Sequence, residues 1–321
     1  MDLCAVALII RHMKRFVALM LVLPLAVVMP TAQAKGPDTD RGAQSDPLQQ
    51  WIQENIDPDV LRALSQLDEE KVQRLLTELQ EAMNGTNIYK LSTLRDTAKQ
   101  VIPLLRRYEE TESLGDWLQT RLDYLEASQE LEREAKAATP RTAGARAPAP
   151  PSLTVEREYW KRDLDQRPWP PLAKTYLPQL KAAFAAEAAP PELAWLAEVE
   201  SSFNPRARSP AGAAGMFQLM PQTARDEQLS LWPWDERFQP EKSARAAARR
   251  LHALHARYGN WELALAAYNA GEGRVDKLLK QRRTRSFEAI EPFLPAETQL
   301  YVPRVEATVR QREGKDFPWR S

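Results

Sequence analysis

The sequence predicts a mainly α protein. From residue 47 to 137 the chain is rich in leucine, glutamate, glutamine and arginine and nearly lacks glycine. Apolar residues in this region recur every three or four positions, the spacing of one helical face, and do not alternate as in a half-buried strand. From residue 172 onward, proline and glycine separate apolar segments of helical length, as they do at helix ends. Both halves of the chain are therefore expected to be helical.

The first 34 residues are typical of an export signal. Two basic residues precede an apolar run at 16–29, and a small-residue pattern at 32–34 fits a cleavage site. The run has 14 residues, fewer than the roughly 20 that span a bilayer as a helix. A retained membrane anchor is the alternative. The only cysteine, Cys4, lies in this segment, so we expect an exported mature chain with neither a disulfide nor a stable membrane span.

Residues 35–138 are predicted to form several amphipathic helices. Asp57-Pro58 and Asp68 are expected to begin helices, Asn84-Gly85 to interrupt one, and Pro103 to kink or begin another. Nothing in this acidic region has the spacing of a catalytic site. We expect a small helical bundle or hairpin that packs on the rest of the chain or holds a protein partner, and its role stays open.

A proline-rich spacer at residues 139–151 marks the predicted domain boundary. Its sequence, T-P-R-T-A-G-A-R-A-P-A-P-P, contains no large apolar residue, so it cannot form a core and is expected to be a semi-rigid linker. Residues 152–321 then form a second, compact helical domain. The R-P-W-P-P run at 167–171 is expected to lie on this domain as an extended strap, because residues before proline avoid the helical region.

One carboxylate of the second domain is placed on an apolar helical face. At about 100° per residue, Glu200 shares this face with Leu196 and Phe203, whereas Glu198 points the other way. A carboxyl group in apolar surroundings tends to stay protonated at neutral pH, because burial disfavours its charged form. Glu200 is therefore a candidate general acid.

The loop after this helix has little side-chain bulk. Between Ser209 and Gly215, the backbone can approach a ligand closely and present N–H groups to it; a plain turn is the alternative. Gln218 is a single amide among large apolar residues that include Met220. Amides in such surroundings often hydrogen-bond an uncharged polar ligand.

Tyr268 and Asn269 lie at the end of another predicted helix, just before Gly271. At this position the phenol of Tyr268 can hydrogen-bond a carboxyl group or a substrate. The alternative is a core tyrosine with a satisfied hydroxyl.

Three sequence blocks resemble a known family. They are E-S-S-F-N-P-R-A-R-S-P-A-G-A-A-G-M-F-Q-L-M-P-Q-T-A at 200–224, A-A-Y-N-A-G-E-G at 266–273 and P-A-E-T-Q-L-Y-V-P at 295–303. In this order they are similar to lytic transglycosylases with a soluble-lytic-transglycosylase (SLT) catalytic domain, in glycoside hydrolase family 23. The resemblance is greatest to the membrane-bound lytic transglycosylase D type. It covers residues 160–312 and says nothing about residues 35–150.

The resemblance implies a lysozyme-like catalytic domain that cleaves the β-1,4 bond between N-acetylmuramic acid and N-acetylglucosamine in peptidoglycan. It gives Glu200 the role of catalytic acid, with Tyr268 near it. The implied substrate-binding residues are Ser209, Gln218, Met220, Tyr268 and Asn269. The expected partner is the peptidoglycan glycan strand, the expected location is the periplasm or cell envelope, and neither a metal nor a cofactor is expected.

The number of carboxylates bears on the mechanism. Ordinary glycosidases use two, about 5 to 9.5 Å apart, but no Asp or Glu lies between Glu200 and Asp226. This fits a reaction in which the substrate's N-acetyl group stabilises the charge at C1. Glu200 then acts as acid and afterwards as base, forming a 1,6-anhydromuramic acid end. Residues that could still fold back as a second carboxylate are Asp226, Glu227, Asp235, Glu236 and Glu297. A hydrolytic muramidase and a catalytically silent wall-binding scaffold are the alternatives.

Other residue groups are less specific. His252 and His255 lack a third ligand at suitable spacing, so surface histidines are favoured over a metal site. A group of arginines between 245 and 285 is not expected to bind nucleic acid in an exported protein. Trp169, Trp232 and Trp234 are candidates for stacking on sugar rings, with burial in the core as the alternative.

Overall fold

The structure, a computed structural model, describes residues 69–107, 109–138, 148–165 and 167–314. The predicted export signal, the helix starts at Asp57 and Asp68 and residues 139–147 of the spacer lie outside them. Chain contacts define two compact units, residues 1–73 and 74–321, and nearly all described residues belong to the second. Within the described residues, no helix combines the length and the hydrophobicity that crossing a membrane requires.

Within the described residues, four helical segments precede the spacer. They are α4 (Glu69–Asn84), the 3-10 helix η1 (Ile88–Leu94), α5 (Arg95–Leu105) and α6 (Glu109–Ala138). α4 ends at the predicted Asn84-Gly85 break, and Pro103 lies inside α5. η1, α5 and α6 pack against one another and bury apolar side chains such as Leu91 and Leu125. The apolar residues that recur every three or four positions therefore form the buried faces of these helices, as predicted.

Twelve helical segments follow the spacer within the described residues. The first are α7 (Leu153–Asp165), α8 (Ala173–Ala186), η2 (Pro191–Trp195), α9 (Leu196–Ser201), α10 (Pro221–Asp226) and η3 (Glu236–Phe238). The rest are α11 (Pro240–Tyr258), α12 (Trp261–Ala270), α13 (Glu272–Arg282), α14 (Phe287–Ile290), η4 (Glu291–Phe293) and α15 (Ala296–Glu313). No β-strand occurs in the described part of the chain, only isolated bridges. The predicted mainly α fold is confirmed.

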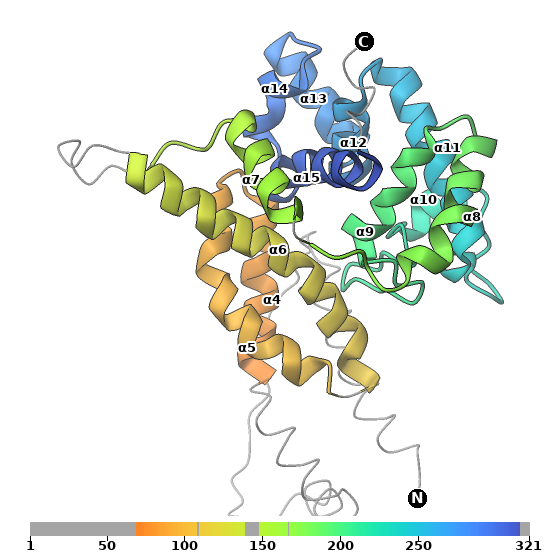
Figure 1. The fold of residues 1–321 in the computed structure, drawn as a ribbon, viewed down its shortest axis with the longest axis horizontal. Coiled ribbons are helices and arrows are strands. Elements are labelled where there is room, and N and C mark those ends of the chain that lie inside the picture. The colour runs from red at the N-terminus through yellow and green to blue at the C-terminus, as the bar shows by residue number, and fades with distance from the viewer. Residues whose placement is uncertain (1–68, 108, 139–147, 166, 315–321) are drawn as a thin grey trace, which may run out of the picture. The chain divides into compact units, whose positions relative to one another are not determined.

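α15 is the central helix of the second unit. It contacts α6 and α7 on one side and α9 and α12 on another (Figure 1). Buried residues occur along its length from Ala296 to Val309, so it is not an amphipathic surface helix. A helix covered on several sides must pair its charged side chains within the protein, and this requirement determines much of the site described below.

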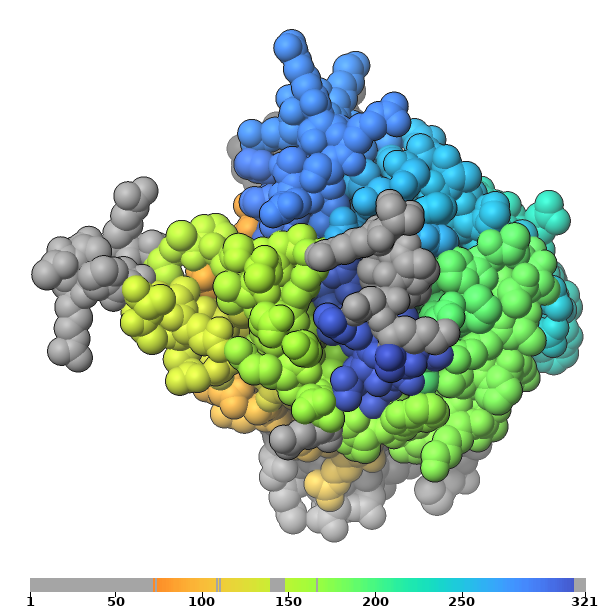
Figure 2. All heavy atoms as spheres, turned by 45° about the horizontal axis from the view of Figure 1, so that its top comes forward, coloured from red at the N-terminus to blue at the C-terminus, as the bar shows by residue number. Residues whose placement is uncertain are grey.

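The helices on the two sides of the spacer belong to one compact unit. α6 contacts α7, α9 and α15, and at the described end of the spacer the Tyr89 hydroxyl donates a hydrogen bond to the Ala149 carbonyl at 2.8 Å. On the face seen in Figure 2, α6, α7 and the C-terminal helices form a continuous surface. The division into an N-terminal helical region and a catalytic domain stays a prediction, but α6 is in direct contact with the helices that follow it.

The predicted strap is present. Residues 167–170 have no helical structure, and Arg312 of α15 donates hydrogen bonds to the carbonyls of Arg167 at 2.8 Å and Pro168 at 3.1 Å. The Trp169 ring packs edge-on against Trp195, with ring centroids 4.9 Å apart. The carbonyls of the strap accept no hydrogen bonds within a helix or sheet, so they are available to Arg312. These hydrogen bonds hold the proline-rich strap on the core.

Candidate active site

Glu200 is buried, as the sequence predicts. It lies near the end of the short helix α9, which stops because Ser202 and Phe203 adopt positive φ values of 52° and 62°. The Glu200 side chain accepts a hydrogen bond at Oε1 from the Tyr301 hydroxyl, at 2.8 Å. Burial raises the pKa of Glu200 to about 7, and the Arg121 charge and the Tyr301 hydrogen bond oppose this rise. An appreciable protonated fraction at neutral pH suits a general acid.

Glu198 lies on another side of α9 than Glu200, as the helical angle predicts. It is buried as well, like all six residues of this helix. Arg312 holds it in a two-pronged ion pair, with Nε to Oε2 at 2.9 Å and Nη2 to Oε1 at 2.6 Å. The helical angle separated the two carboxylates correctly but assumed that one helical face meets water, and in this fold none does.

The phenol that contacts the acid is Tyr301, not Tyr268. The Tyr268 hydroxyl donates instead to the Phe217 carbonyl, at 2.8 Å. Tyr268 still lies close enough for the Glu200 charge to act on it, since burial and then that charge raise the pKa of Tyr268 well above its ordinary value. Tyr301 belongs to the third sequence block and lies four residues after Glu297, so both side chains are on the same side of a helix. This was the feature of the sequence that could have indicated the role of Tyr301.

The loop between α9 and α10 is held in a fixed shape. Isolated bridges join Ala214 to Arg208 and to Leu219, and the Ser201 hydroxyl donates to the Met216 carbonyl at 2.9 Å. Gly215 has a φ of 77°, and a Cβ atom there would lie 1.8 Å from the Arg237 carbonyl oxygen. Only glycine fits this position. The small residues thus allow the loop to pack closely on η3.

The predicted substrate-binding residues have different surroundings. Gln218 donates through Nε2 to the Gly215 carbonyl at 2.8 Å, while its Oε1 is buried without a partner. Asn269 accepts a hydrogen bond from the Thr298 hydroxyl at 2.6 Å. Ser209 accepts one from the Ala213 amide at 2.9 Å, within its own loop, and Met220 is 43% exposed. The Tyr268 bond to the carbonyl of Phe217, next to Gln218, connects α12 to this loop.

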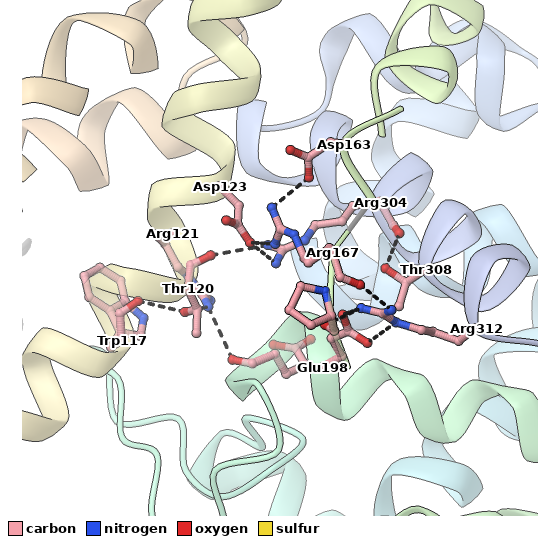
Figure 3. A network of polar contacts seen from close by, with 12 residues as sticks. Trp117, Thr120, Arg121, Asp123, Asp163, Arg167, Glu198, Arg304, Thr308 and Arg312 are labelled. Atoms are coloured by element: carbon pink, nitrogen blue, oxygen red, sulfur yellow. Dashed lines mark hydrogen bonds and ion pairs between the residues drawn. The ribbon is translucent and has the colours of Figure 1, made fainter. Parts of the chain in front are cut away.

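α6 contributes residues that the sequence did not indicate. Arg121, 8% exposed, donates through Nη1 to the backbone carbonyl of Glu200 at 3.5 Å and through Nη2 to Glu297 at 3.2 Å. Figure 3 shows arginines of α6, of the strap and of α15 meeting beside α9. Residues 35–138 have no spacing typical of a catalytic site, yet Arg121 of this region lies beside Glu200. Arg121 precedes Glu200 by 79 residues, so no local spacing could indicate the contact.

Asp123, two residues further along α6, binds two arginines. It pairs with the buried Arg304 of α15 and, at 2.7 Å, with Arg167 of the strap. Arg167 also pairs with Asp163 at 2.7 Å. This network, visible in Figure 3, fastens α6 and the strap to the helix that carries Tyr301.

Of the carboxylates considered as a second acid, Glu297 lies in the site. Its charge raises the pKa of Glu200, after the stronger effects of burial, Arg121 and Tyr301. Arg121 holds it in an ion pair. The other candidates bond elsewhere: Asp226 to Gln222, Glu227 to Arg249, Asp235 to Arg237 and Glu236 to Lys242. Glu297 is thus the second carboxylate at the site, and its charge is compensated.

The two histidines have protein neighbours. His252 Nδ1 lies 3.0 Å from the Ala188 carbonyl oxygen, and the His255 ring stacks on Trp261 with centroids 4.0 Å apart. Within the described residues there is no group of three or more histidine, cysteine, aspartate or glutamate side chains that could hold a metal ion.

The similarity to known proteins lies in the part of the chain that contains Glu200. Residues 179–290 match the family model described as the transglycosylase SLT domain. The chain is 41% identical over 122 residues to the membrane-bound lytic murein transglycosylase D of Escherichia coli (strain K12), covering 37% of this chain and 27% of that protein. It is 35% identical over 122 residues to the soluble lytic murein transglycosylase of Salmonella typhimurium (strain LT2), covering 35% of this chain and 19% of that protein.

Among solved structures, an inactive mutant of the lytic transglycosylase Slt from Pseudomonas aeruginosa is similar over 78% of this chain and 56% of that chain, with 21% identity and a TM-score of 0.41. The matches to the two murein transglycosylases span less than a third of those proteins' own length. The SLT match contains Glu200 and the loop after it, together with Tyr268 and Asn269. The similarity to the transglycosylase SLT domain is therefore located in residues 179–290, about a third of the chain.

Proposed function

We propose that this chain is a peptidoglycan lytic transglycosylase. It would cleave the β-1,4 bond between N-acetylmuramic acid and N-acetylglucosamine and leave a 1,6-anhydromuramic acid end. The observation that carries the proposal is the surroundings of the buried Glu200, which lies within the residues that match the SLT domain, accepts a hydrogen bond from the Tyr301 phenol and lies beside Arg121. The relatives' names, lytic murein transglycosylases, agree with it.

In this reaction Glu200 acts twice. With a pKa raised to about 7, it is protonated often enough to donate a proton to the glycosidic oxygen as the bond from that oxygen to C1 breaks. The N-acetyl group of the substrate stabilises the positive charge at C1. The resulting carboxylate, supported by the Tyr301 hydroxyl and the Arg121 charge, then takes the proton of the muramic acid 6-hydroxyl. The 6-oxygen bonds to C1, and no water is consumed.

The buried amide of Gln218 supports a polar, uncharged substrate. Its Oε1 has no hydrogen-bond partner although the atom is buried, and buried polar atoms in folded proteins are nearly always satisfied. A hydroxyl or an acetamido N–H of a sugar would supply the missing donor. Together with Ser209, Met220, Tyr268 and Asn269, Gln218 is proposed to line the substrate path.

The proposed location is the periplasm or cell envelope, after removal of residues 1–34. The sequence pattern of these residues and the family of the relatives support it. A protein partner for the helices before the spacer stays part of the proposal, and nucleic acid is not proposed as a ligand.

Digestion of purified peptidoglycan, followed by mass spectrometry of the released fragments, tests the proposal. We expect 1,6-anhydromuramic acid ends. Reducing muramic acid ends would show a muramidase instead, and the absence of any product would favour a wall-binding scaffold.

The Arg121–Glu297 pair is predicted to set the pH range of activity. Because the acid must be protonated, activity falls on the alkaline side as Glu200 loses its proton. Arg121 lowers the pKa of Glu200 and Glu297 raises it. Arg121→Met should therefore move the alkaline limb of kcat/KM to higher pH, and Glu297→Gln should move it to lower pH, each by roughly one unit.

Opposite shifts from the two members of one ion pair distinguish an electrostatic role from a structural one. Loss of folding would lower activity at every pH without moving the limb in opposite directions. The double variant serves as control and should return the limb close to its original position. Equal or absent shifts would show that the pair does not act on Glu200.

A further inference from the structure

Two tryptophans are displayed to solvent on the loop that connects α10 to η3. Trp232 is 84% exposed and Trp234 is 78% exposed, the highest values of any large hydrophobic residue in the described part of the chain. An indole offers more apolar area for burial than almost any other side chain. Leaving two of them in water, two positions apart, forgoes that stabilisation, and such exposed apolar groups often mark a binding surface.

The loop is closed at its base, so the indoles are held on an ordered support. The Ser230 amide donates to the Glu236 carboxylate at 2.8 Å, and the Glu236 amide donates to the Ser230 carbonyl at 2.9 Å. The Ser230 hydroxyl also donates to the Trp232 carbonyl at 2.6 Å. A backbone fixed before binding loses little conformational freedom when a ligand arrives.

Arg237 joins this loop to the proposed substrate loop. Its buried guanidinium pairs with Asp235 at 2.7 Å and donates to the carbonyls of Gly212 at 2.8 Å and Leu219 at 2.9 Å. Asp235 directly follows Trp234, and Leu219 directly precedes the half-exposed Met220. The tryptophan loop is therefore anchored to the same loop that carries Ser209 and Gln218.

We propose that Trp232 and Trp234 form an outlying sugar-binding platform, which holds the glycan strand beyond the bond that is cleaved. This inference rests on the proposed function and adds a binding site to it. The apolar C–H face of a pyranose ring packs on the flat face of an indole. Two indoles anchored beside the substrate loop suit a long strand whose sugars continue past the catalytic residues.

The charges around the loop favour a glycan over an anionic lipid surface. Asp235 and Glu236 directly follow the tryptophans in the sequence, and each pairs with a cation, Arg237 and Lys242 respectively. Binding to anionic lipid uses clusters of unpaired basic residues, and the loop itself contains none.

The test uses the full chain and two substrates. Binding to insoluble purified peptidoglycan sacculi is measured by sedimentation, and turnover is measured on sacculi and on a short soluble fragment, a single tetrasaccharide of alternating N-acetylglucosamine and N-acetylmuramic acid. For Trp232→Ala/Trp234→Ala we expect about tenfold weaker binding to sacculi and reduced turnover of sacculi, with turnover of the tetrasaccharide within about twofold of the unaltered protein.

Two further variants exclude trivial causes. Leu172→Ala, at a 40% exposed residue on another surface segment, should change neither binding nor turnover. Trp232→Leu/Trp234→Leu keeps apolar bulk but removes the flat ring, and should bind sacculi as weakly as the alanine pair. Circular dichroism and the thermal midpoint verify that each variant is folded.

Three results would overturn the platform: unchanged binding of the folded alanine pair to sacculi, an equal loss of turnover on both substrates, or wild-type binding to phosphatidylglycerol vesicles that the alanine pair loses. Failure of the proposed function looks different. In that case the unaltered protein releases no anhydromuramic product from either substrate, while the effect of the tryptophans on sacculus binding is still measurable.

Discussion

Glu200→Gln should abolish the release of 1,6-anhydromuramic fragments from peptidoglycan, lowering kcat by at least about 10³-fold. The amide keeps the shape of the side chain, but it can neither give a proton to the glycosidic oxygen nor take one from the 6-hydroxyl. Because one residue performs both transfers in the proposed reaction, neither half of the reaction remains. Mass spectrometry of the digest, with wild-type protein in parallel, measures the loss.

The same variant should be at least as stable as the wild type. A buried carboxyl whose pKa rises from 4.5 to about 7 on folding stabilises the fold only while it is protonated. That contribution is complete below pH 4.5 and is lost as the pH rises to about 7, amounting to roughly 3 kcal/mol. Glutamine does not ionise, so its advantage over the wild type in thermal unfolding should grow from pH 5 to pH 8.

Glu241→Gln, at an exposed carboxylate of α11, is the matched control and should leave activity unchanged. Anhydromuramic products from the folded Glu200→Gln protein would show that another residue is the acid.

Asp123→Ala should destabilise the protein by about 3–5 kcal/mol, the usual consequence of removing one partner of a buried ion pair. Arg304 is 3% exposed, and Asp123 is its ion-pair partner; Arg167 of the strap binds the same carboxylate. Without Asp123, a buried guanidinium loses its compensating charge and the strap loses one of its two carboxylates. Urea denaturation followed by circular dichroism measures the loss.

Asp163→Ala is the control for this prediction. Its carboxylate is 26% exposed and, of the arginines in the network, pairs only with Arg167. Removing it should therefore lower the free energy of unfolding by no more than about 1 kcal/mol. Equal losses of stability from the two substitutions would mean that the burial of Arg304 does not determine how much stability is lost.

The Asp123 contact also predicts the behaviour of residues 152–321 expressed alone. This fragment lacks α6, so Arg304 would have no carboxylate from that helix and Glu200 would lose Arg121. We expect low solubility and little activity compared with the mature chain. Full activity of the soluble fragment would show that α6 is dispensable.

The sequence by itself determined the local features of this protein. Helical spacing predicts the α fold, proline and glycine mark several helix ends, and the position of Glu200 among leucine and phenylalanine predicts its burial. The three sequence blocks indicate the SLT domain. Each of these inferences depends on neighbours within a few turns of helix, where side-chain direction follows from backbone geometry.

Only the tertiary structure decided which partners surround the acid. Tyr301 lies 101 residues after Glu200 and Arg121 lies 79 residues before it, while Asp123 and Arg304 are 181 residues apart. A helical period tells which side of a helix faces a neighbour but not which helix that neighbour is. It also assumes one face in water, and α9 and α15 are covered on several sides by the packing of α6, α7 and α12. The electrostatic environment of Glu200 is therefore a product of packing, which local spacing cannot encode.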